Sequence, residues 1–289
     1  MFPTIAPITV ALFGGLGNQM FQYAFARAQS IACGAAFCLD LRPLSVGGDR
    51  HYSLAGFSLE HSRAPNFPLP PVPSRVFRKM GWSPRLNGAS YVFQTTFSAP
   101  VPAYVQPAYF WGTWQGEKYF RAASSVIRGD FSLLTPFSDA RQAIAQSIVS
   151  SNSVAVHVRR GDYVSNSKAS AFHGTLSPQW YALAKEAMES GTSDERKYFV
   201  FSDDDKWARE NINCFKDAIF IRPSSDGRDF EDLHLMALCK SQIIANSSFS
   251  WWGAWLNPNP HKRVVAPLAW FRSARETTED LIPSSWHRV

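Results

Sequence analysis

The second half of this 289-residue chain alternates short apolar runs with longer helical patterns, and this alternation restricts the fold more than any other feature. Strands are predicted at 153–158, 197–202, 218–221, 242–246 and 263–266. Helices are predicted at 178–190, 204–211, 229–240, 249–256 and 275–282. Strands that alternate with helices form a parallel, doubly wound sheet, because each helix carries the chain back across the sheet.

The first half begins with the same pattern. Strands are predicted at 8–13, 36–40 and 104–111, and helices at 18–32 and 137–150. Residues 64–75 contain five prolines, which cannot continue a helix, so an extended surface loop is expected there.

A chain of this length can form two modest domains. We expect two Rossmann-like α/β domains, residues 1–150 and residues 151–289, with a last helix that can cross back to the first domain. The boundary is expected near 150–153, where one helical pattern ends and the next strand begins.

Composition narrows the classes of partner. The net charge is +6, and no block of like charge is long enough for a nucleic-acid-binding arm. No signal peptide and no run of 18 apolar residues is found, which predicts a cytoplasmic protein, with weak contact to an acidic inner membrane face left open. The four cysteines form no CxxC pair and are expected to be free thiols.

The predicted strand at 153–158 ends in two arginines, Arg159 and Arg160, and carries His157 near the same end. In open α/β sheets the carboxyl edge is where ligands bind. Because a guanidinium group can bond two oxygens of a phosphate at once, this edge predicts a phosphate site. A structural ion pair with Asp162 is the alternative for one of the two arginines.

A glycine-rich turn, Gly14-Gly-Leu-Gly-Asn-Gln19, follows the first strand and opens a helix. Such a turn lets the backbone approach a ligand and directs N–H groups at an anion. A dinucleotide site is a weaker alternative, because Met20 replaces the third glycine of that motif, although Asp40 lies where a ribose-binding acid would be. A turn needed only for packing is the third interpretation.

An acidic run, Ser202-Asp-Asp-Asp205, ends the strand at 197–202. Three interpretations stay open: a helix cap by Ser202 or Asp203, a metal site built on Asp203 and Asp205, and a contact to a hydroxyl group of the ligand. The position at the carboxyl edge favours the third, and the cap can hold beside it.

Two further helix starts carry candidate ligand groups. Asp232 lies in the first turn of the helix at 229–240, where its carboxylate favours the helix end and can also accept two N–H bonds from guanine. Ser247, Ser248 and Ser250 gather at the start of the helix at 249–256, which suits a phosphate. Of the aromatic residues in that helix, Trp251, Trp252 and Trp255 are expected in the core.

Four segments together resemble the α-1,2-fucosyltransferases of glycosyltransferase family 11. They are Gly14-Gly-Leu-Gly-Asn-Gln-Met-Phe-Gln-Tyr23, His157-Val-Arg-Arg-Gly-Asp-Tyr163, Ser202-Asp-Asp-Asp205 and Asn246-Ser-Ser-Phe-Ser-Trp-Trp-Gly-Ala254. The resemblance spans nearly the whole chain, and the acidic run alone is unspecific. The second half is more distantly similar to α-1,6-fucosyltransferases and protein O-fucosyltransferases.

This resemblance implies a GT-B fold, in which two Rossmann-like domains face a central cleft. It implies GDP-L-fucose as the donor, held mainly by residues 151–289, with residues 1–150 on the acceptor side. It further implies inversion at the anomeric carbon, no required metal and no other cofactor.

The resemblance also assigns roles to residues. Arg159 matches the arginine that holds the β-phosphate, whereas His157 and Asp232 match residues near the guanine and ribose. Three residues of the serine turn match the contact to the pyrophosphate: Ser248, Phe249 and Ser250. Three residues of the glycine turn match a loop that closes on the phosphate or fucose: Gly17, Asn18 and Gln19. Arg160 and Asp203 are added as donor-binding candidates because they lie at the carboxyl edge.

The catalytic base is a point of departure from the related α-1,6 enzymes. They carry a glutamate ten residues after the histidine of the arginine motif, where this chain has Ser167. Asp162 and His173 are candidates by proximity in the sequence. The expected reaction is transfer of L-fucose to O2 of a terminal galactoside such as lactose, an O-antigen unit or a glycolipid. A metal-dependent glycosyltransferase and a non-catalytic nucleotide-sugar binder are the alternatives.

Overall fold

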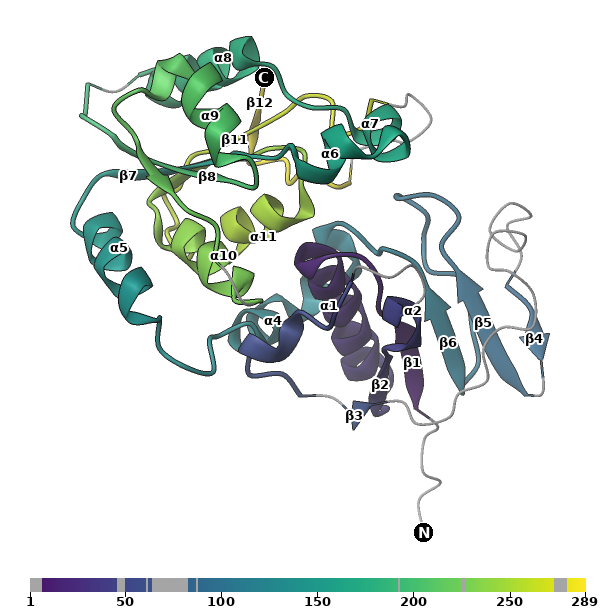
Figure 1. Ribbon diagram of the computed structural model, residues 1–289. Coiled ribbons are helices and arrows are strands. Elements are labelled where there is room, and N and C mark those ends of the chain that lie inside the picture. The colour runs from purple at the N-terminus through teal and green to yellow at the C-terminus, as the bar shows by residue number, and fades with distance from the viewer. Residues whose placement is uncertain are drawn as a thin grey trace. The chain divides into compact units, whose positions relative to one another are not determined.

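The computed structural model describes residues 7–45, 50–60, 62–63, 83–86, 88–191, 193–224, 227–272 and 280–289 (Figure 1). The chain divides into two compact units. The first consists of Met1–Leu134 and Glu279–Leu281, and the second of Thr135–Thr278 and Ile282–Val289.

The first unit is built on one sheet in the order β3-β2-β1-β6-β5-β4. Its strands are β1 (Ile8–Ala11), β2 (Phe37–Asp40), β3 (Ser62–Arg63), β4 (Arg85–Leu86), β5 (Ala89–Phe93) and β6 (Ala108–Trp111). All neighbouring strands are parallel except β4 and β5. The strands expected at 8–13 and 36–40 are confirmed, and the one expected at 104–111 begins only after Pro107, which has no N–H for the ladder.

Helix α1 (Leu16–Cys33) connects β1 to β2, as expected, and it ends at Gly34 in the left-handed region at φ 64. Its buried face includes Met20, Phe21 and Phe25. Among the described residues of this unit, the other helices are α2 (Arg42–Ser45), α4 (Ser124–Asp130) and the 3-10 turns Leu54–Gly56, Glu117–Tyr119 and Arg121–Ala123.

The second unit contains a fully parallel sheet in the order β12-β11-β10-β7-β8-β9. Its strands are β7 (Ser153–Val158), β8 (Lys197–Ser202), β9 (Ile219–Ile221), β10 (Ser241–Ile243), β11 (Val264–Ala266) and β12 (His287–Arg288). Counted from β7, this is the 3-2-1-4-5-6 order of doubly wound nucleotide-binding sheets. The predicted fold class is therefore confirmed in this unit.

Helices cover both faces of this sheet (Figure 1). The helices described in this unit are α5 (Asp139–Val149), α6 (Gly161–Ser165), α7 (Ser167–His173), α8 (Pro178–Glu189), α9 (Asp205–Asn211), α10 (Asp229–Leu238) and α11 (Ser248–Leu256). One core cluster joins β7 and β8 to α8 and α9, and the other joins them to α5 and α10. The two short helices α6 and α7 were not predicted.

The division between the units falls earlier than the boundary expected at residue 150. Helix α5 belongs to the second unit because Ala145 and Ile148 pack in the same core cluster as Phe199 and Met236. A helical pattern shows that α5 is amphipathic, but it does not show which sheet its apolar face covers.

Several smaller expectations have clear outcomes. Trp251, Trp252 and Trp255 are buried, as predicted. All four cysteines are free. The proline-rich segment 64–75 lies outside the described residues, as does most of the helix expected at 275–282, of which residues 280–282 form a turn and bend. Within the described ranges, no helix combines the length and apolar character needed to cross a bilayer.

Candidate functional site

A cavity of about 150 Å³ lies in the second unit where β7, β8 and β9 end. Its lining consists of His157, Arg159, Phe201, Ser202, Asp203, Ile221, Pro223, Ser224, Asp229, Asp232 and Phe249. Five residues predicted from sequence to bind a donor or act in catalysis line this cavity: His157, Arg159, Asp203, Asp232 and Phe249. The carboxyl edge of the sheet is the position expected for a ligand.

His157 is buried at the end of β7 and lines the cavity. Burial, together with the charge of Arg159, lowers the pKa of its imidazole to about 3, so the ring is neutral at physiological pH. The ring lies 5.5 Å from that of Phe249, and its Nδ1 atom has no hydrogen-bond partner among the described residues. A buried polar atom without a partner costs free energy, and a ligand in this cavity can supply one.

Asp203 and Tyr163 are two of the described neighbours of Arg159. Its Nη1 atom lies 2.9 Å from Oδ2 of Asp203, and its guanidinium lies 5.5 Å from the ring centre of Tyr163. The hydroxyl of Tyr163 donates to the carbonyl of Asn246 at 3.1 Å. A guanidinium carries five N–H groups, the kind of group that binds phosphate oxygens.

Arg160 points to other partners and is not among the residues that line the cavity. Its Nε donates to Asp204 at 3.4 Å, and its guanidinium lies 3.8 Å from the ring centre of Trp207. Its backbone N–H donates to Asp203 at 2.8 Å. Both arginines thus form ion pairs, whereas the sequence favoured a pair for one of them, and the partners described are Asp203 and Asp204 in place of Asp162.

The three aspartates of the acidic run have different contacts. Asp203 lines the cavity, Asp204 caps α9 by accepting from the N–H of Trp207 at 3.1 Å, and Asp205 accepts from Arg209 at 2.9 Å. The expected helix cap is present, but the capping residue is Asp204, in place of the Ser202 or Asp203 predicted from the sequence. In the part of the chain that the structure describes, no group of three or more His, Cys, Asp or Glu side chains is placed to hold a metal ion.

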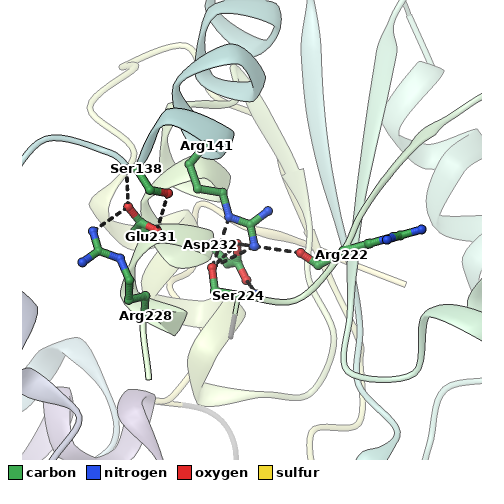
Figure 2. A network of polar contacts seen from close by, with 7 residues as sticks. All are labelled: Ser138, Arg141, Arg222, Ser224, Arg228, Glu231 and Asp232. Carbon is green, nitrogen blue, oxygen red and sulfur yellow. Dashed lines mark hydrogen bonds and ion pairs between the residues drawn. The ribbon is translucent and has the colours of Figure 1, made fainter. Parts of the chain in front are cut away.

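Asp232 lies in the first turn of α10 and belongs to a polar network (Figure 2). Its Oδ2 accepts from the backbone N–H of Ser224 at 2.7 Å, and its Oδ1 accepts from the Ser224 hydroxyl at 3.1 Å. Nη2 of Arg141 lies 2.9 Å from the same Oδ1. Burial raises the pKa of Asp232 above its usual value, while Ser224 and Arg141 oppose that shift.

Glu231, the neighbour of Asp232, joins α10 to the start of α5 (Figure 2). Its carboxylate accepts from the N–H of Ser138 at 2.7 Å, from the Ser138 hydroxyl at 3.1 Å and from Arg228 at 2.9 Å. Burial alone would raise the pKa of Glu231, but the hydrogen bonds from Arg228 and Ser138 hold it below the usual range. Two successive carboxylates thus fix the beginning of α5 against α10.

The serine turn begins α11. Phe249 lines the cavity, and Ser248 is partly exposed beside it. Ser250 is fully buried, and its hydroxyl lies 3.3 Å from the carbonyls of Ala245 and Ser247. The Ser250 hydroxyl therefore serves the turn itself, and the contribution left to the first turn of α11 is its backbone N–H groups and the Ser248 hydroxyl.

In the first unit, the glycine turn positions Asn18 beside Gly14. Gly14 has φ 79, and an added Cβ would lie 2.5 Å from Nδ2 of Asn18. Oδ1 of Asn18 accepts from Gln115 at 2.7 Å, which leaves its NH₂ group to act as a donor. Helix α1 starts at Leu16, so Gly17 lies within its first turn rather than before it.

Gln115 follows a constrained turn. Trp114 has φ 50, a region that bulky residues rarely adopt. The turn is held because Gln94 accepts from the N–H groups of Thr113 at 2.8 Å and Trp114 at 2.9 Å. The ring of Trp114 also stacks on Phe25 at 4.2 Å.

Gln19 is fully buried and acts within the fold. Its Nε2 donates to the carbonyls of Gly14 at 2.9 Å and His51 at 2.8 Å, and its Oε1 accepts from the N–H of Ser53 at 2.9 Å. Both N–H donors of this amide are used by the protein, so Gln19 holds residues 51–53 against the glycine turn. Its expected contact to the donor stays a prediction.

Asp40 is committed to other side chains. It is buried and accepts from Arg42 through both oxygens at 2.8 Å, and from the Tyr109 hydroxyl at 2.6 Å. Burial would raise its pKa, but the bonds from Arg42 and Tyr109 hold the pKa below its usual value. A carboxylate so occupied is poorly placed to bind ribose, which weakens the dinucleotide interpretation.

The two candidate bases follow β7. Asp162 lies in α6, where the structure does not describe its side chain. His173 ends α7, and its ring stacks on Tyr163 at 4.5 Å with an interplanar angle of 1°. His173 and Arg159 therefore both contact the ring of Tyr163. The role of His173 as a proton acceptor stays a prediction.

Sequence reasoning missed Arg141, Ser224 and Tyr163. Tyr163 carries a weak signal, because it lies four residues after Arg159 in the same segment. Arg141 and Ser224 carry none, because each becomes relevant only when α5 and the end of β9 are brought to α10.

The comparisons with known proteins agree with this arrangement. The model of the family described as "Glycosyl transferase family 11" matches residues 96–289, about two thirds of the chain. The chain belongs to glycosyltransferase family 11. Within the family, it is 34% identical over 98% of its length to an α-1,2-colitosyltransferase from Escherichia coli, of which it also covers 98%.

Three further similarities extend the comparison. The chain is 25% identical to galactoside α-(1,2)-fucosyltransferase 2 from Oryctolagus cuniculus, over 86% of this chain and 66% of that protein. Among solved structures, fucosyltransferase NodZ from Bradyrhizobium superposes with a TM-score of 0.53 at 15% identity, covering 86% of this chain and 92% of NodZ. NodZ α-1,6-fucosyltransferase soaked with GDP-fucose gives 0.52 at 15%, covering 88% and 93%. The expected GT-B fold class is confirmed.

Proposed function

We propose that this family 11 enzyme transfers L-fucose from GDP-β-L-fucose to O2 of a terminal galactoside, with inversion at the anomeric carbon. The observation that carries the proposal is the cavity at the ends of β7, β8 and β9, which gathers a guanidinium, a neutral buried imidazole and three carboxylates. Those groups suit a nucleoside diphosphate: a cation for the phosphates and acceptors for base and ribose.

Arg159 is the proposed principal stabiliser of the leaving group. As the bond between fucose and GDP breaks, the sugar gains oxocarbenium character and the β-phosphate gains negative charge. A fixed guanidinium and the N–H groups at the start of α11 are worth more as that charge develops than before it. Asp203, 2.9 Å from Arg159, would hold the guanidinium in place before the donor binds.

The same scheme limits what is asked of a base. If leaving-group departure precedes attack, the acceptor hydroxyl loses its proton late, and a phosphate oxygen can receive it. Asp162 and His173 stay candidate proton acceptors, and Asp162 is the one proposed for catalysis. The contacts of Gly17, Asn18 and Gln19 to the donor are likewise proposed on the resemblance alone.

A second donor is favoured by one specific observation. The 34% identical relative is an α-1,2-colitosyltransferase, and colitose is the 3-deoxy counterpart of L-fucose. GDP-colitose is therefore the alternative donor for this site. The acceptor class, a galactose-terminated glycan such as lactose, an O-antigen unit or a glycolipid, is proposed from the family. Weak contact with an acidic membrane surface is proposed from the net charge of +6.

The experiment that tests this proposal is a donor and acceptor array read by GDP release. GDP-fucose and GDP-colitose are each offered with galactose-, glucose- and N-acetylglucosamine-terminated acceptors. We expect GDP release that depends on a galactoside. GDP-fucose binding without release on any acceptor would favour the non-catalytic binder instead.

Activity is expected to survive exhaustive chelation with EDTA. The diphosphate charge would be met by Arg159 and the α11 N–H groups, while Asp203 is paired with Arg159 and Asp205 with Arg209. The measurement compares initial rates before chelation, after it, and after Mg²⁺ or Mn²⁺ is restored. Loss of activity on chelation with recovery on adding metal would support the metal-dependent alternative built on Asp203 and Asp205.

A further inference from the structure

The side chain of Arg141, on α5, reaches groups at the wall of the cavity (Figure 2). Its Nη2 donates to the carbonyl of Arg222 at 2.7 Å and to the Ser224 hydroxyl at 2.8 Å, and lies 2.9 Å from Oδ1 of Asp232. Its Nε donates to the same hydroxyl at 3.1 Å. The side chain of Arg141 is 10% exposed, so these contacts are largely shielded from water.

The acceptor sites of Asp232 are nearly filled by these contacts. A carboxylate offers about four lone-pair positions. Oδ1 uses two, for Arg141 and the Ser224 hydroxyl, and Oδ2 uses one, for the Ser224 N–H. One lone-pair position on Oδ2 remains for a ligand. A second becomes available on Oδ1 when the Ser224 hydroxyl rotates its proton away, and Arg141 still holds the hydroxyl oxygen in place through its own donors.

We propose that Arg141 is the positioning residue for base recognition: it keeps Asp232 as an oriented, ionised acceptor and so makes the site select guanine over adenine. Guanine presents two N–H groups on the edge where adenine presents a ring nitrogen acceptor and an amino group. An ionised carboxylate accepts from the first pair and repels the adenine ring nitrogen, whereas a protonated carboxyl can donate to it. This inference rests on the proposed use of a GDP-sugar.

The charges around Asp232 make Arg141 important for its ionisation. Glu231 adjoins it on α10, and Asp229, Asp203, His157 and Arg159 line the same cavity. Three of these neighbours are acids, His157 is neutral, and Arg159 is paired with Asp203. Arg141 is the cation in direct contact with Asp232, and burial already raises the pKa of this carboxyl. Without Arg141 the pKa rises further, so the carboxylate form is lost first at low pH and returns as the pH increases.

The test is Arg141→Met, assayed by calorimetry with GDP and with ADP from about pH 5.5 to about pH 8.5. At the acid end, we expect GDP affinity to fall about 10- to 100-fold and the preference for GDP over ADP to shrink. Both should recover as the pH rises. The wild-type preference should change little over the range.

Arg228→Met is the matched control. It removes an arginine from the neighbouring pair with Glu231, 2.9 Å away, and no contact to Asp232 is described for it. It should leave the pH dependence of the GDP preference as in the wild type. The double variant Arg141→Met with Asp232→Asn should bind GDP weakly at every pH, because the titrating carboxyl is gone.

Each outcome decides a different question. An unchanged GDP-to-ADP ratio in folded Arg141→Met, or equal pH dependence in the two single variants, would overturn the role of Arg141. Pronounced pH dependence in the double variant would do the same, because it would assign the titration to another group. Failure of the wild-type protein to bind GDP would instead reject the proposed function.

Discussion

Arg159→Lys is expected to lower kcat by ~10²–10³ with the fold intact. Lysine keeps the positive charge, but it lacks the fork that can bond Asp203 and two phosphate oxygens at once. Arg159 is a quarter exposed and contacts Asp203 and the face of Tyr163, so the ammonium of lysine can be accommodated without opening the core. Because the contact strengthens as the leaving group gains charge, the loss should fall on kcat more than on KM.

The measurement is steady-state kinetics with the donor, accompanied by thermal unfolding. Arg209→Lys is the matched control, since Arg209 pairs with Asp205 on the exposed side of α9 at 2.9 Å and should keep wild-type kinetics. A kcat for Arg159→Lys within about threefold of the wild type, far from the expected ~10²–10³, would remove Arg159 from the mechanism.

Asp232→Asn is expected to weaken GDP binding by about 10- to 100-fold and to destabilise the protein. The amide offers one acceptor oxygen in place of two, and its NH₂ group faces the donors of Ser224 and guanine. The change also leaves Arg141 buried beside a neutral group, and breaking a buried pair by removing one partner costs about 3–5 kcal/mol.

Calorimetry with GDP and ADP separates these two effects, because the affinity ratio does not depend on the folded fraction. The ratio should fall in Asp232→Asn. Asp205→Asn, a paired acid on the surface of α9, should leave it unchanged. If Asp232→Asn is destabilised but keeps the wild-type ratio, Asp232 is a helix-start acid with no contact to the base.

The residues at the carboxyl edge of the second sheet could be predicted from the sequence for a physical reason. Apolar, β-branched runs that stop at charged residues mark where strands end, and parallel strands all end at the same edge. His157, Arg159 and Asp203 could therefore be placed together before any coordinates, and Asp232 and Phe249 follow from the start of α10 and α11.

What the sequence could not provide is the pairing of side chains across elements. Arg141 has the same local pattern as any arginine on an amphipathic helix, and only the packing of α5 on α10 brings it to Asp232. Arg160 and Arg159 are adjacent and chemically alike, yet they point to Asp204 and Asp203 respectively. Gln19 is similar, because a buried amide that serves the backbone looks in sequence like one that serves a ligand.

Strand β5 shows the limit for the fold. All five of its residues are buried, including Ser90, so it has no alternation between polar and apolar faces to detect. It also follows the proline-rich segment 64–75, so no regular pattern in the preceding sequence indicates where this strand begins.

The transfer of L-fucose to O2 of a galactoside is tested most directly by NMR analysis of the product. The chelated enzyme is incubated with GDP-β-L-fucose and lactose, and the linkage is read from the anomeric coupling and from the shift of the galactose H2 proton. We expect one α-linked fucose on O2 of the galactose, with one GDP released for each fucose transferred. A β-linked product, or fucose attached at another hydroxyl, would contradict it.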